Sequence, residues 1–446
     1  MLDEITLRIM HEFNGHWKTG EIPRRLLGSV ETSLFEHAAK KLHDRSILSV
    51  VGLRRTGKST LLYQLADMLL RNGTQPKRVF YFSFDETTSK KPEVIDDLIR
   101  EYFSSVCKEP LDSKETHYII LDEVQKVEDW QGVVKRHYDL KYGIKFVVSG
   151  SQTLMLKGKT RESLAGRTRD FTSNPLSFRE FLKFKGMKVP HLPAKELYRQ
   201  FLPEKEKMRN LFEEFLLKGG FPETVGYNAQ ETQGYIKSVV EKIVFIDIPL
   251  QFKVENPEIL MRMLELLSSN TAQLFELEKI TGTLSINRNT AAAYLSHLEN
   301  AFLIKLCYNC TKSKAKQLRT RRKAYIADTG IANTMLRKNS LSEDPEYAGL
   351  LAETAIFNEI ARKHDAFFWR DKSQNEIDIL AKINGKISPV EVKYRNEITA
   401  KDTSTIERYV KEHKTQGTIV TKDTYKHERR LTFMPAWLFC MSNQDP

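Results

Sequence analysis

The chain has 446 residues, and its 70 Lys and Arg against 58 Asp and Glu give a formal net charge of +12. A hydrophobic content of 40% excludes a disordered protein, and the length predicts about three domains. No apolar run approaches the ~18 residues of a membrane-spanning helix, no secretory signal pattern opens the sequence, and four cysteines are too few for a disulfide framework. We therefore expect a cytoplasmic protein without a membrane partner.

The basic surplus suits a polyanionic partner such as nucleic acid, although a spread-out excess of Lys is the simpler alternative. We interpret residues 1–30 as an N-terminal arm that leads into a first domain, residues 31–181. Within this domain, residues 47–51 are apolar and β-branched, which favours a buried parallel strand. Residues 52–59 have the spacing G-x-x-x-x-G-K-S, and an apolar pattern of helical period follows. Strand, glycine loop and helix form the context that a phosphate-binding loop requires.

The geometry of such a loop assigns a role to each residue. Gly52 and Gly57 allow a tight turn whose N–H groups point at a phosphate, and the helix aims its positive end at the same place. Lys58 can reach the β- and γ-phosphates, and Ser59 can ligate Mg²⁺. We therefore predict ATP and Mg²⁺ as cofactors. The nucleotide-binding residues are Gly52, Arg55, Thr56, Gly57, Lys58, Ser59, Thr60 and, farther along the chain, Asp122.

The partner of the loop is expected where an apolar run, residues 118–121, ends in two carboxylates. Asp122 would hold Mg²⁺ at the carboxyl end of a strand, and Glu123 would act as the general base toward the attacking water. The next apolar run, residues 144–148, ends in hydroxyls, so Ser149 or Ser151 could sense the γ-phosphate. The alternative for the two acids is a solvated strand end.

Farther on, Arg167 is either an arginine finger that acts in the site of a neighbouring subunit or half of a structural salt bridge. Strands that alternate with helices through this domain predict a parallel sheet covered on both faces.

The order of loop lysine, Asp-Glu pair and hydroxyl-ended strand resembles the AAA+ branch of P-loop ATPases. Leu-Ala-Gly-Arg at 164–167, Pro-Leu-Ser-Phe-Arg-Glu-Phe at 175–181, Gly-Gly-Phe-Pro at 219–222 and Ala-Asp-Thr-Gly at 327–330 resemble one prokaryotic family in it, which joins an AAA-type ATPase to a C-terminal domain of unknown function. The resemblance implies an α/β fold with an AAA+/ASCE parallel sheet. It also implies a homo-oligomer, with a hexamer as one option.

Residues 182–256 are predicted to be mostly helical, as a lid that packs beside the nucleotide. The pattern then changes, and residues 257–330 resemble a winged helix-turn-helix. Its third helix is predicted to be capped by Asn287 and to begin at Arg288. Arg288 and Asn289 lie off its apolar stripe and are candidates for reading bases.

A basic run separates the two strands of this segment. Seven of the residues from Lys312 to Lys323 are basic and none is acidic. A hairpin loop of this kind is placed to touch phosphates, whereas the alternative is a solubilising loop. Some winged helices bind protein instead. The candidate DNA-binding residues are Arg288, Asn289, Lys312, Lys314, Lys316, Arg319, Arg321 and Arg322.

Residues 331–446 carry a second set of carboxylates. Glu353 shares the apolar face of a predicted helix, where a carboxylate costs free energy unless it binds something. Asp378 lies on a predicted strand, and alternation places Glu391 and Lys393 on one face of the next.

This pattern resembles the core of the PD-(D/E)XK nucleases and predicts an α+β nuclease-like domain. In that resemblance Glu353, Asp378 and Glu391 bind Mg²⁺, and Lys393 orients or activates the attacking water. The alternatives are a nuclease-like fold that only binds and a charged hairpin.

Two hypotheses follow. The first is an ATP-hydrolysing AAA+ protein that acts on DNA and carries a magnesium-dependent nuclease domain. The second is an ATP-gated switch that displays a DNA- or protein-binding module and cuts nothing.

Overall fold

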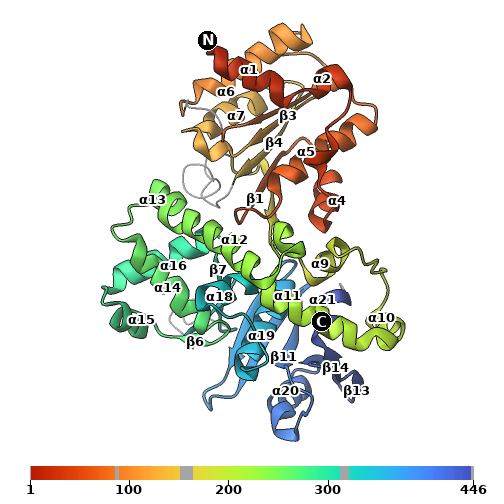
Figure 1. Cartoon of the computed structure of the whole chain (residues 1–446), viewed down its shortest axis with the longest axis vertical. Coiled ribbons are helices and arrows are strands. Elements are labelled where there is room, and N and C mark those ends of the chain that lie inside the picture. Colours follow the sequence, from red (N-terminus) through yellow and green to blue (C-terminus); the bar gives the residue numbers. More distant parts are fainter. Residues whose placement is uncertain (1, 86–89, 151–163, 312–320, 443–446) are drawn as a thin grey trace. The chain divides into compact units, whose positions relative to one another are not determined.

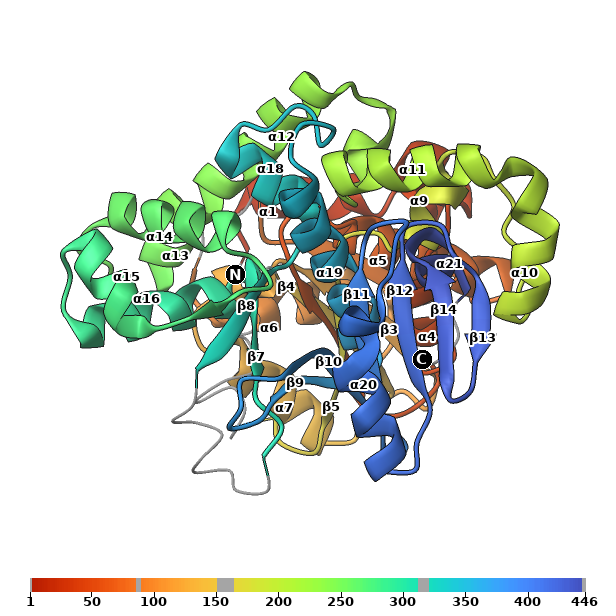
Figure 2. The same cartoon turned by 90° about the horizontal axis from the view of Figure 1, so that it is seen from below.

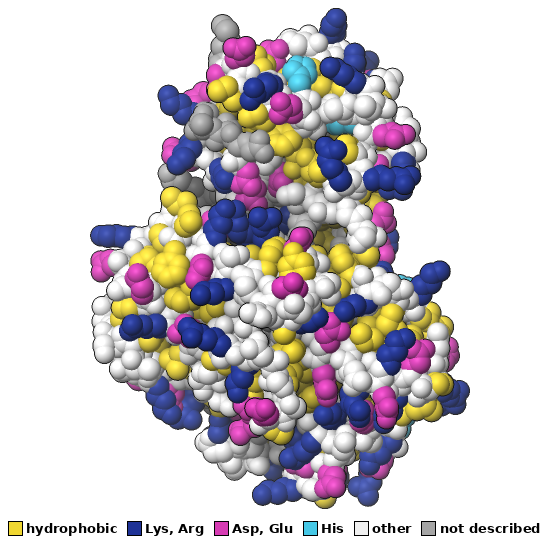
Figure 3. All heavy atoms as spheres, in the orientation of Figure 1, with side chains coloured by type: hydrophobic (Ala, Val, Ile, Leu, Met, Phe, Trp, Pro, Cys, Tyr) yellow, Lys and Arg dark blue, Asp and Glu magenta, His cyan; other side chains and the backbone are white. Residues whose placement is uncertain are grey.

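The computed structural model describes residues 2–85, 90–150, 164–311 and 321–442. The chain divides into two compact units, Met1–Ser173 and Asn174–Pro446 (Figure 1). In the described residues, no helix combines the length and the apolar character needed to cross a bilayer. On the face shown in Figure 3, Lys and Arg side chains are interspersed with Asp and Glu. On this face the positive charge is spread out.

The first unit is built on a five-stranded sheet in the order β2-β3-β4-β1-β5, in which every pair of neighbours is parallel. Every residue of β1, β2 and β3 is buried, which explains why these strands are continuous apolar runs in the sequence. The strands are β1 (Ile47–Gly52), β2 (Val79–Ser83), β3 (His117–Asp122), β4 (Ile144–Gly150) and β5 (Thr168–Ser173).

Helices cover both faces of this sheet, as predicted. Helices α4 and α5 join alternate strand residues such as Val50 and Ile120 in one hydrophobic core. On the other face, Phe80 contacts Tyr102 of η2, and Phe146 contacts His137 of α7. These elements are α4 (Ser33–Ala39), α5 (Lys58–Arg71), η1 (Pro76–Arg78), α6 (Glu93–Glu101), η2 (Tyr102–Cys107), η3 (Val124–Lys126) and α7 (Trp130–Asp139).

The predicted arm, residues 1–30, is helical and packs on the sheet. It contains α1 (Glu4–Phe13), α2 (His16–Thr19) and α3 (Arg24–Leu27). The Asn14 side chain pairs with the backbone N–H and C=O of Tyr81 on β2, with both hydrogen bonds 2.7 Å long. Gln64 of α5 donates to the carbonyls of Leu27 and Val30. The arm therefore fixes both the outer edge of β2 and the phosphate-loop helix.

The second unit begins with helices, as predicted for residues 182–256. Of these, α11 and α12 both pack against α18 in the same unit. Helix α9 lies mostly within the predicted 31–181 domain but belongs to this unit. The helices are α9 (Phe178–Phe184), α10 (Ala194–Phe201), η5 (Leu202–Glu204), α11 (Lys205–Lys218), η6 (Pro222–Gly226), α12 (Ala229–Lys242), η7 (Ile243–Asp247) and α13 (Ile248–Gln251).

In the described part of residues 257–336, four helices accompany a three-stranded sheet with the strand order β6-β8-β7. Asn287 caps α16 through a 2.8 Å bond from the N–H of Thr290, as predicted. Leu274 lies in a short strand that pairs with Lys323, and the second helix begins at Leu277. The elements are α14 (Pro257–Ser269), β6 (Leu274–Phe275), α15 (Leu277–Leu284), α16 (Arg288–Asn300), β7 (Ile304–Tyr308), β8 (Arg322–Ile326) and α18 (Thr329–Leu336).

The remainder of the unit is a six-stranded mixed sheet in the order β13-β14-β12-β11-β10-β9 (Figure 2). Strands β9, β10 and β11 are antiparallel neighbours, whereas β11, β12 and β14 run parallel. Helix α20 packs on one face through Ile406 and Val410. The elements are α19 (Pro345–Ala361), β9 (Asp365–Arg370), β10 (Glu376–Ile383), β11 (Lys386–Lys393), α20 (Ala400–Glu412), β12 (Gly417–Thr421), β13 (Lys426–Glu428), β14 (Leu431–Pro435) and α21 (Ala436–Ser442).

Helix α21 closes the second unit. All of its residues are buried, and it packs against α9, α10, α11 and α19. The guanidinium of Arg179 in α9 donates to the carbonyls of Met441, Val189 and Pro190. One buried cation therefore joins the first helix of the unit to its last.

Candidate functional site

The phosphate loop lies between β1 and α5, as the motif predicts. Arg55 and Gly57 both have left-handed backbone conformations, with φ of 66° and 89°. Lys58 is the first residue of α5, and its buried Nζ donates to the carbonyl of Leu53 at 3.0 Å. Ser59 and Thr60 complete the first turn of the helix. The loop thus turns back on its own lysine at the positive end of a 14-residue helix.

Ser173, the last residue of β5, holds this loop from the side. Thr56 Oγ1 lies 2.9 Å from Ser173 Oγ and 3.1 Å from its carbonyl oxygen. Gly52 passes so close that a Cβ there would lie 2.1 Å from the same carbonyl. Ser173 was not predicted as a site residue because most residues of β5 are exposed or half-buried, so the strand lacks the apolar run of the others.

The predicted acids lie at the end of β3, two strands away from the loop. Strand β4 lies between β1 and β3 and carries Ser149, whose hydroxyl donates to Oδ1 of Asp122. The hydroxyl of Tyr81 on β2 donates to Oδ2 at 2.9 Å. Both oxygens of Asp122 are therefore oriented by buried hydroxyls. Ser151, the other candidate sensor, lies outside the described residues.

Glu123 is buried and has a left-handed backbone conformation with φ of 52°. Its Oε2 accepts a 2.5 Å hydrogen bond from the amide of Gln125. Burial raises the pKa of Glu123, the Lys58 ammonium lowers it, and the charge of Asp122 raises it again, so that the pKa is above the ordinary value. Glu123 therefore lies within electrostatic range of the loop lysine. A general base benefits from a pKa moved toward neutral pH.

Arg167 forms a fork with Asp139 of the same chain. Nε lies 2.8 Å from Oδ1 and Nη2 lies 3.1 Å from Oδ2. This pair is the structural salt bridge predicted as the alternative to an arginine finger. A role in a neighbouring subunit stays a prediction.

The C-terminal acids come together as the strand pattern predicts. Oδ2 of Asp378 accepts from the N–H of Val392 at 2.8 Å, and Oε2 of Glu391 lies 3.4 Å from the N–H of Asp378. Lys393 Nζ lies 2.5 Å from Glu391 Oε1 and 3.9 Å from Asp378 Oδ2. Burial and the charge of Asp378 raise the pKa of Glu391. Residues from β10 and β11 thus form one charged cluster.

A lysine lies beside the acids predicted to bind Mg²⁺, and the metal role of Glu353, Asp378 and Glu391 stays a prediction. The ammonium of Lys323 lies 2.9 Å from Glu353 Oε1 and 3.7 Å from Asp378 Oδ1, two of the three acids predicted to bind a metal. Among the described residues, no group of three or more His, Cys, Asp or Glu is arranged to hold a metal ion. The sequence placed Lys323 in the basic run, yet alternation in β8 already puts it on the same face as Tyr325.

The candidate DNA-binding residues are only partly described, since Lys312, Lys314, Lys316 and Arg319 lie outside the described residues. Arg288 and Asn289 are exposed at the start of α16, and Arg288 Nη1 lies 3.1 Å from Glu278 Oε1. Arg321 pairs with Glu276. The guanidinium of Arg322 lies over the ring of Tyr308, 5.6 Å from its centroid. The two exposed arginines, Arg288 and Arg321, are therefore each paired with an acid at or just before the start of α15.

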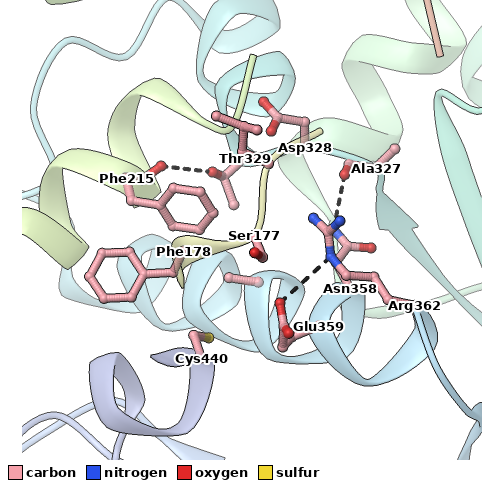
Figure 4. A pocket seen from close by; sticks show the side chains of 12 residues that line it. Ser177, Phe178, Phe215, Ala327, Asp328, Thr329, Asn358, Glu359, Arg362 and Cys440 are labelled. Atoms are coloured by element: carbon pink, nitrogen blue, oxygen red, sulfur yellow. Dashed lines mark hydrogen bonds and ion pairs between the residues drawn. The ribbon is translucent and has the colours of Figure 1, made fainter. Parts of the chain in front are cut away.

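Three of the motifs that carry the family resemblance, at residues 175–181, 219–222 and 327–330, meet around Asp328. Its carboxylate accepts from the N–H groups of Gly220 and Gly330, at 2.7 and 2.9 Å. A Cβ on Gly219 would lie 1.9 Å from Asp328 Oδ1. Figure 4 shows Ser177, Asp328 and Arg362 around a small pocket with a cavity of about 20 Å³. That volume holds one water molecule and no nucleotide, so the motifs build the centre of the second unit.

Comparison with known proteins supports the division of the chain. Residues 44–182 match a family described as "AAA domain". Residues 209–342 match a domain of unknown function, DUF8612, and residues 348–439 match another, DUF4143.

Two similar proteins are an uncharacterized protein of Haemophilus influenzae and the uncharacterized protein MJ1544 of Methanocaldococcus jannaschii. The first is 29% identical over 392 residues, which span 86% of this chain and 88% of that protein. The second is 26% identical over 350 residues, which span 76% and 73%. Among solved structures, the Walker-type ATPase PABY2304 of Pyrococcus abyssi has a TM-score of 0.45 at 14% identity, covering 71% of this chain and 98% of that one.

The parallel sheet and the phosphate loop give the first unit a P-loop NTPase fold, in agreement with the match of residues 44–182 to an AAA domain. The chain joins this domain to a second unit that carries a mixed sheet of its own.

Proposed function

We propose that the chain hydrolyses ATP in its first unit and uses the nucleotide cycle to control a DNA-binding second unit. One observation carries the first half of this proposal. Glu123, the candidate base, is buried beside Asp122 and interacts electrostatically with Lys58 of the phosphate loop. A binding loop, a metal-binding carboxylate and a base are the parts that nucleotide hydrolysis needs.

The residues divide the work in the following way. The loop N–H groups and the Lys58 ammonium would hold the phosphates of ATP, and Ser59 and Asp122 would hold Mg²⁺, which would neutralise phosphate charge. Glu123 accepts a proton from the attacking water. Ser149 keeps Asp122 oriented through its buried hydroxyl. The oriented Asp122 carboxylate at a strand end suits a hard cation, which prefers oxygen ligands.

The test is to measure ATP binding and ATP turnover separately. Lys58→Ala should weaken binding, whereas Glu123→Gln should keep binding and lose about 10²-fold or more in turnover. Normal turnover in Glu123→Gln would refute the assignment of the base. A Lys58→Ala variant that binds ATP as tightly as the wild type would refute the site.

The second half of the proposal concerns residues 257–330, which we interpret as a winged helix-turn-helix. Three helices and the sheet β6-β8-β7 occur in the order that this motif requires. The exposed Arg288 and Asn289 lie at the start of α16, where a recognition helix contacts base edges. The net charge of +12 is of the sign that favours DNA.

One observation favours a protein partner as the second candidate. Arg288 and Arg321 are paired with Glu278 and Glu276, which lowers the positive potential at this surface. Anisotropy with labelled duplex and branched DNA over a salt series separates the two. DNA binding predicts affinity that falls steeply with salt and drops in Arg288→Ala/Asn289→Ala. The protein partner would be favoured by DNA binding that is independent of salt and equal in the wild type and the variant, together with ATP turnover that does not change over a DNA titration.

We do not assign nuclease activity to the second unit, because Lys323 lies among the carboxylates that would hold Mg²⁺. For residues 331–446 we therefore propose a nuclease-like fold that binds without cutting. Assembly into a homo-oligomer stays a prediction, which sedimentation with and without ATP can check.

A further inference from the structure

Lys323 joins three elements through one buried ammonium group. Its side chain is 3% exposed, and besides Glu353 of α19 its Nζ contacts Glu376 of β10 at 2.9 Å. A third carboxylate, that of Asp378 on β10, lies 3.7 Å from the same nitrogen. The ammonium group of Lys323 is therefore enclosed by three carboxylates.

The distances match an ammonium ion rather than a space for a metal. Charge-assisted N–H···O bonds are about 2.7–2.9 Å long, whereas Mg²⁺ binds oxygen at about 2.0–2.1 Å. The two shortest contacts of Lys323 are both 2.9 Å. A divalent ion placed among the same oxygens would add two positive charges directly beside this ammonium.

Asp378, the central acid, is engaged on both sides. Lys323 faces Oδ1 at 3.7 Å, and Lys393 faces Oδ2 at 3.9 Å. Oδ2 also accepts from the N–H of Val392. The carboxylate that a metal would need most is thus held between two side-chain cations and the backbone.

Tyr325, two residues farther along β8, strengthens the same junction. Its hydroxyl donates to Oε1 of Glu353 at 2.7 Å, the oxygen that Lys323 also contacts. Its ring stacks on Phe357 of α19, with centroids 3.7 Å apart and planes 7° apart. One face of β8 therefore fastens the three-stranded sheet to the helix that supplies Glu353.

We propose that Lys323 is a built-in cation that replaces the divalent metal of a nuclease-like site. It balances the charge of Glu353, Glu376 and Asp378, it stands in for a metal beside the two predicted ligands Glu353 and Asp378, and it fastens β8 to α19. The second unit therefore retains a latent metal site that the chain itself occupies. This inference does not depend on ATP hydrolysis in the first unit.

The experiment titrates Mn²⁺ into the full-length, nucleotide-free protein and follows free Mn²⁺ by electron paramagnetic resonance. Lys323→Met should gain about one Mn²⁺ per chain relative to the wild type, because the carboxylates lose their resident cation. The gain should vanish in Lys323→Met/Asp378→Asn. Lys323→Arg keeps the positive charge and should gain no site.

Two results would overturn the proposal. One is Mn²⁺ binding by the wild type that Asp378→Asn abolishes, since the site would then accept metal beside Lys323. The other is a Lys323→Met variant that is folded by circular dichroism and gains no Mn²⁺. If Lys323→Met alone does not fold, Lys323→Met/Glu376→Gln removes one charge of each sign and answers the same question. The comparison of wild type with Asp378→Asn tests the proposal in either case.

Discussion

The hydroxyl of Tyr81 donates a 2.9 Å hydrogen bond to Oδ2 of Asp122 across two neighbouring strands. Tyr81 also stacks on Tyr63 of the phosphate-loop helix, with ring centroids 4.2 Å apart. Asp122 is thus oriented by a residue that packs directly against the helix of the phosphate loop. The side chain of Tyr81 therefore contacts both the Asp122 carboxylate and the helix that follows the phosphate loop.

We expect Tyr81→Phe to lower ATP turnover about tenfold while leaving the stack on Tyr63 intact. A buried hydrogen bond to a charged group contributes about 1.5–3 kcal/mol, and its loss lets the carboxylate move. Steady-state turnover and urea unfolding measure the two effects. Tyr102→Phe is the matched control, because Tyr102 is equally buried and donates to the carbonyl of Lys77 at 2.7 Å, away from Asp122. The control should lose stability and keep turnover; unchanged turnover in Tyr81→Phe would contradict the prediction.

The pH dependence of turnover follows from the environment of Glu123. Burial raises its pKa above the ordinary value, and a base must be deprotonated to accept a proton, so turnover should rise with pH through a midpoint above 4.5. The Gln125 hydrogen bond favours the ionised form. Gln125→Ala should therefore move the acidic limb of the kcat profile to higher pH. A limb that stays in place, or moves to lower pH, would show that Gln125 does not hold the base.

Ser173→Ala should weaken ATP binding roughly three- to tenfold, because the hydroxyl no longer braces Thr56 in the phosphate loop. Isothermal titration with ATP and Mg²⁺ measures this change. Ser49→Ala is a matched control, since Ser49 is fully buried in β1 and contributes nothing to the loop contacts described above. Equal affinity for ATP in Ser173→Ala and Ser49→Ala would show that Ser173 does not support the phosphate loop.

The stability of the second unit should depend on pH through Asp328. Burial raises the pKa of Asp328 to about 6 from 3.8, so the folded state binds the proton more tightly than the unfolded state. The contribution of this group is fully present below pH 3.8 and is lost as pH rises through about 6, by at most about 3 kcal/mol.

Denaturant unfolding of the wild type and Asp328→Asn between pH 4 and 7 isolates this contribution. The stability of the wild type relative to the variant should decrease as pH rises across this interval. A difference that grows with pH would mean that the backbone N–H groups of Gly220 and Gly330 stabilise the charged form more than burial destabilises it.

Arg167→Ala should change ATP turnover less than about twofold, because the side chain pairs with Asp139 in its own chain and an exposed pair contributes about 0–1 kcal/mol. An arginine finger would instead account for about 10³-fold or more. Turnover of the variant over a range of protein concentrations distinguishes the two. A large loss of ATP turnover that appears only at concentrations where the protein self-associates would support an arginine-finger role for Arg167.

The phosphate loop and three of the strands beside it were predictable because fully buried parallel strands are short apolar runs. Strand β5 was not, because its sequence Thr-Arg-Asp-Phe-Thr-Ser lacks such a run and it lies at the edge of the sheet. Tyr81 and Ser173 were missed for a related reason. Their roles depend on which strands become neighbours, and a single sequence does not state the strand order.

For the C-terminal acids, the sequence pattern predicted which side chains on β10 and β11 meet, but not the lysine that lies beside them. Alternation correctly brought Asp378, Glu391 and Lys393 together, since register on a pleated strand has period two. It did not reveal that a lysine 30 residues before Glu353 lies between the acids. The basic run hid Lys323, because its neighbours in sequence suggested a solvent-exposed loop.

The hydrogen bond from Arg179 to the carbonyl of Met441 spans 262 positions of the chain. On a ribosome that adds about 5–20 residues per second, α9 emerges tens of seconds before its partner helix exists. The five-stranded sheet of the first unit, as described, ends at Ser173 and can be completed during this interval. The second unit must wait with uncovered apolar helices, so nascent chains stalled before residue 436 are the species that we expect chaperones to hold.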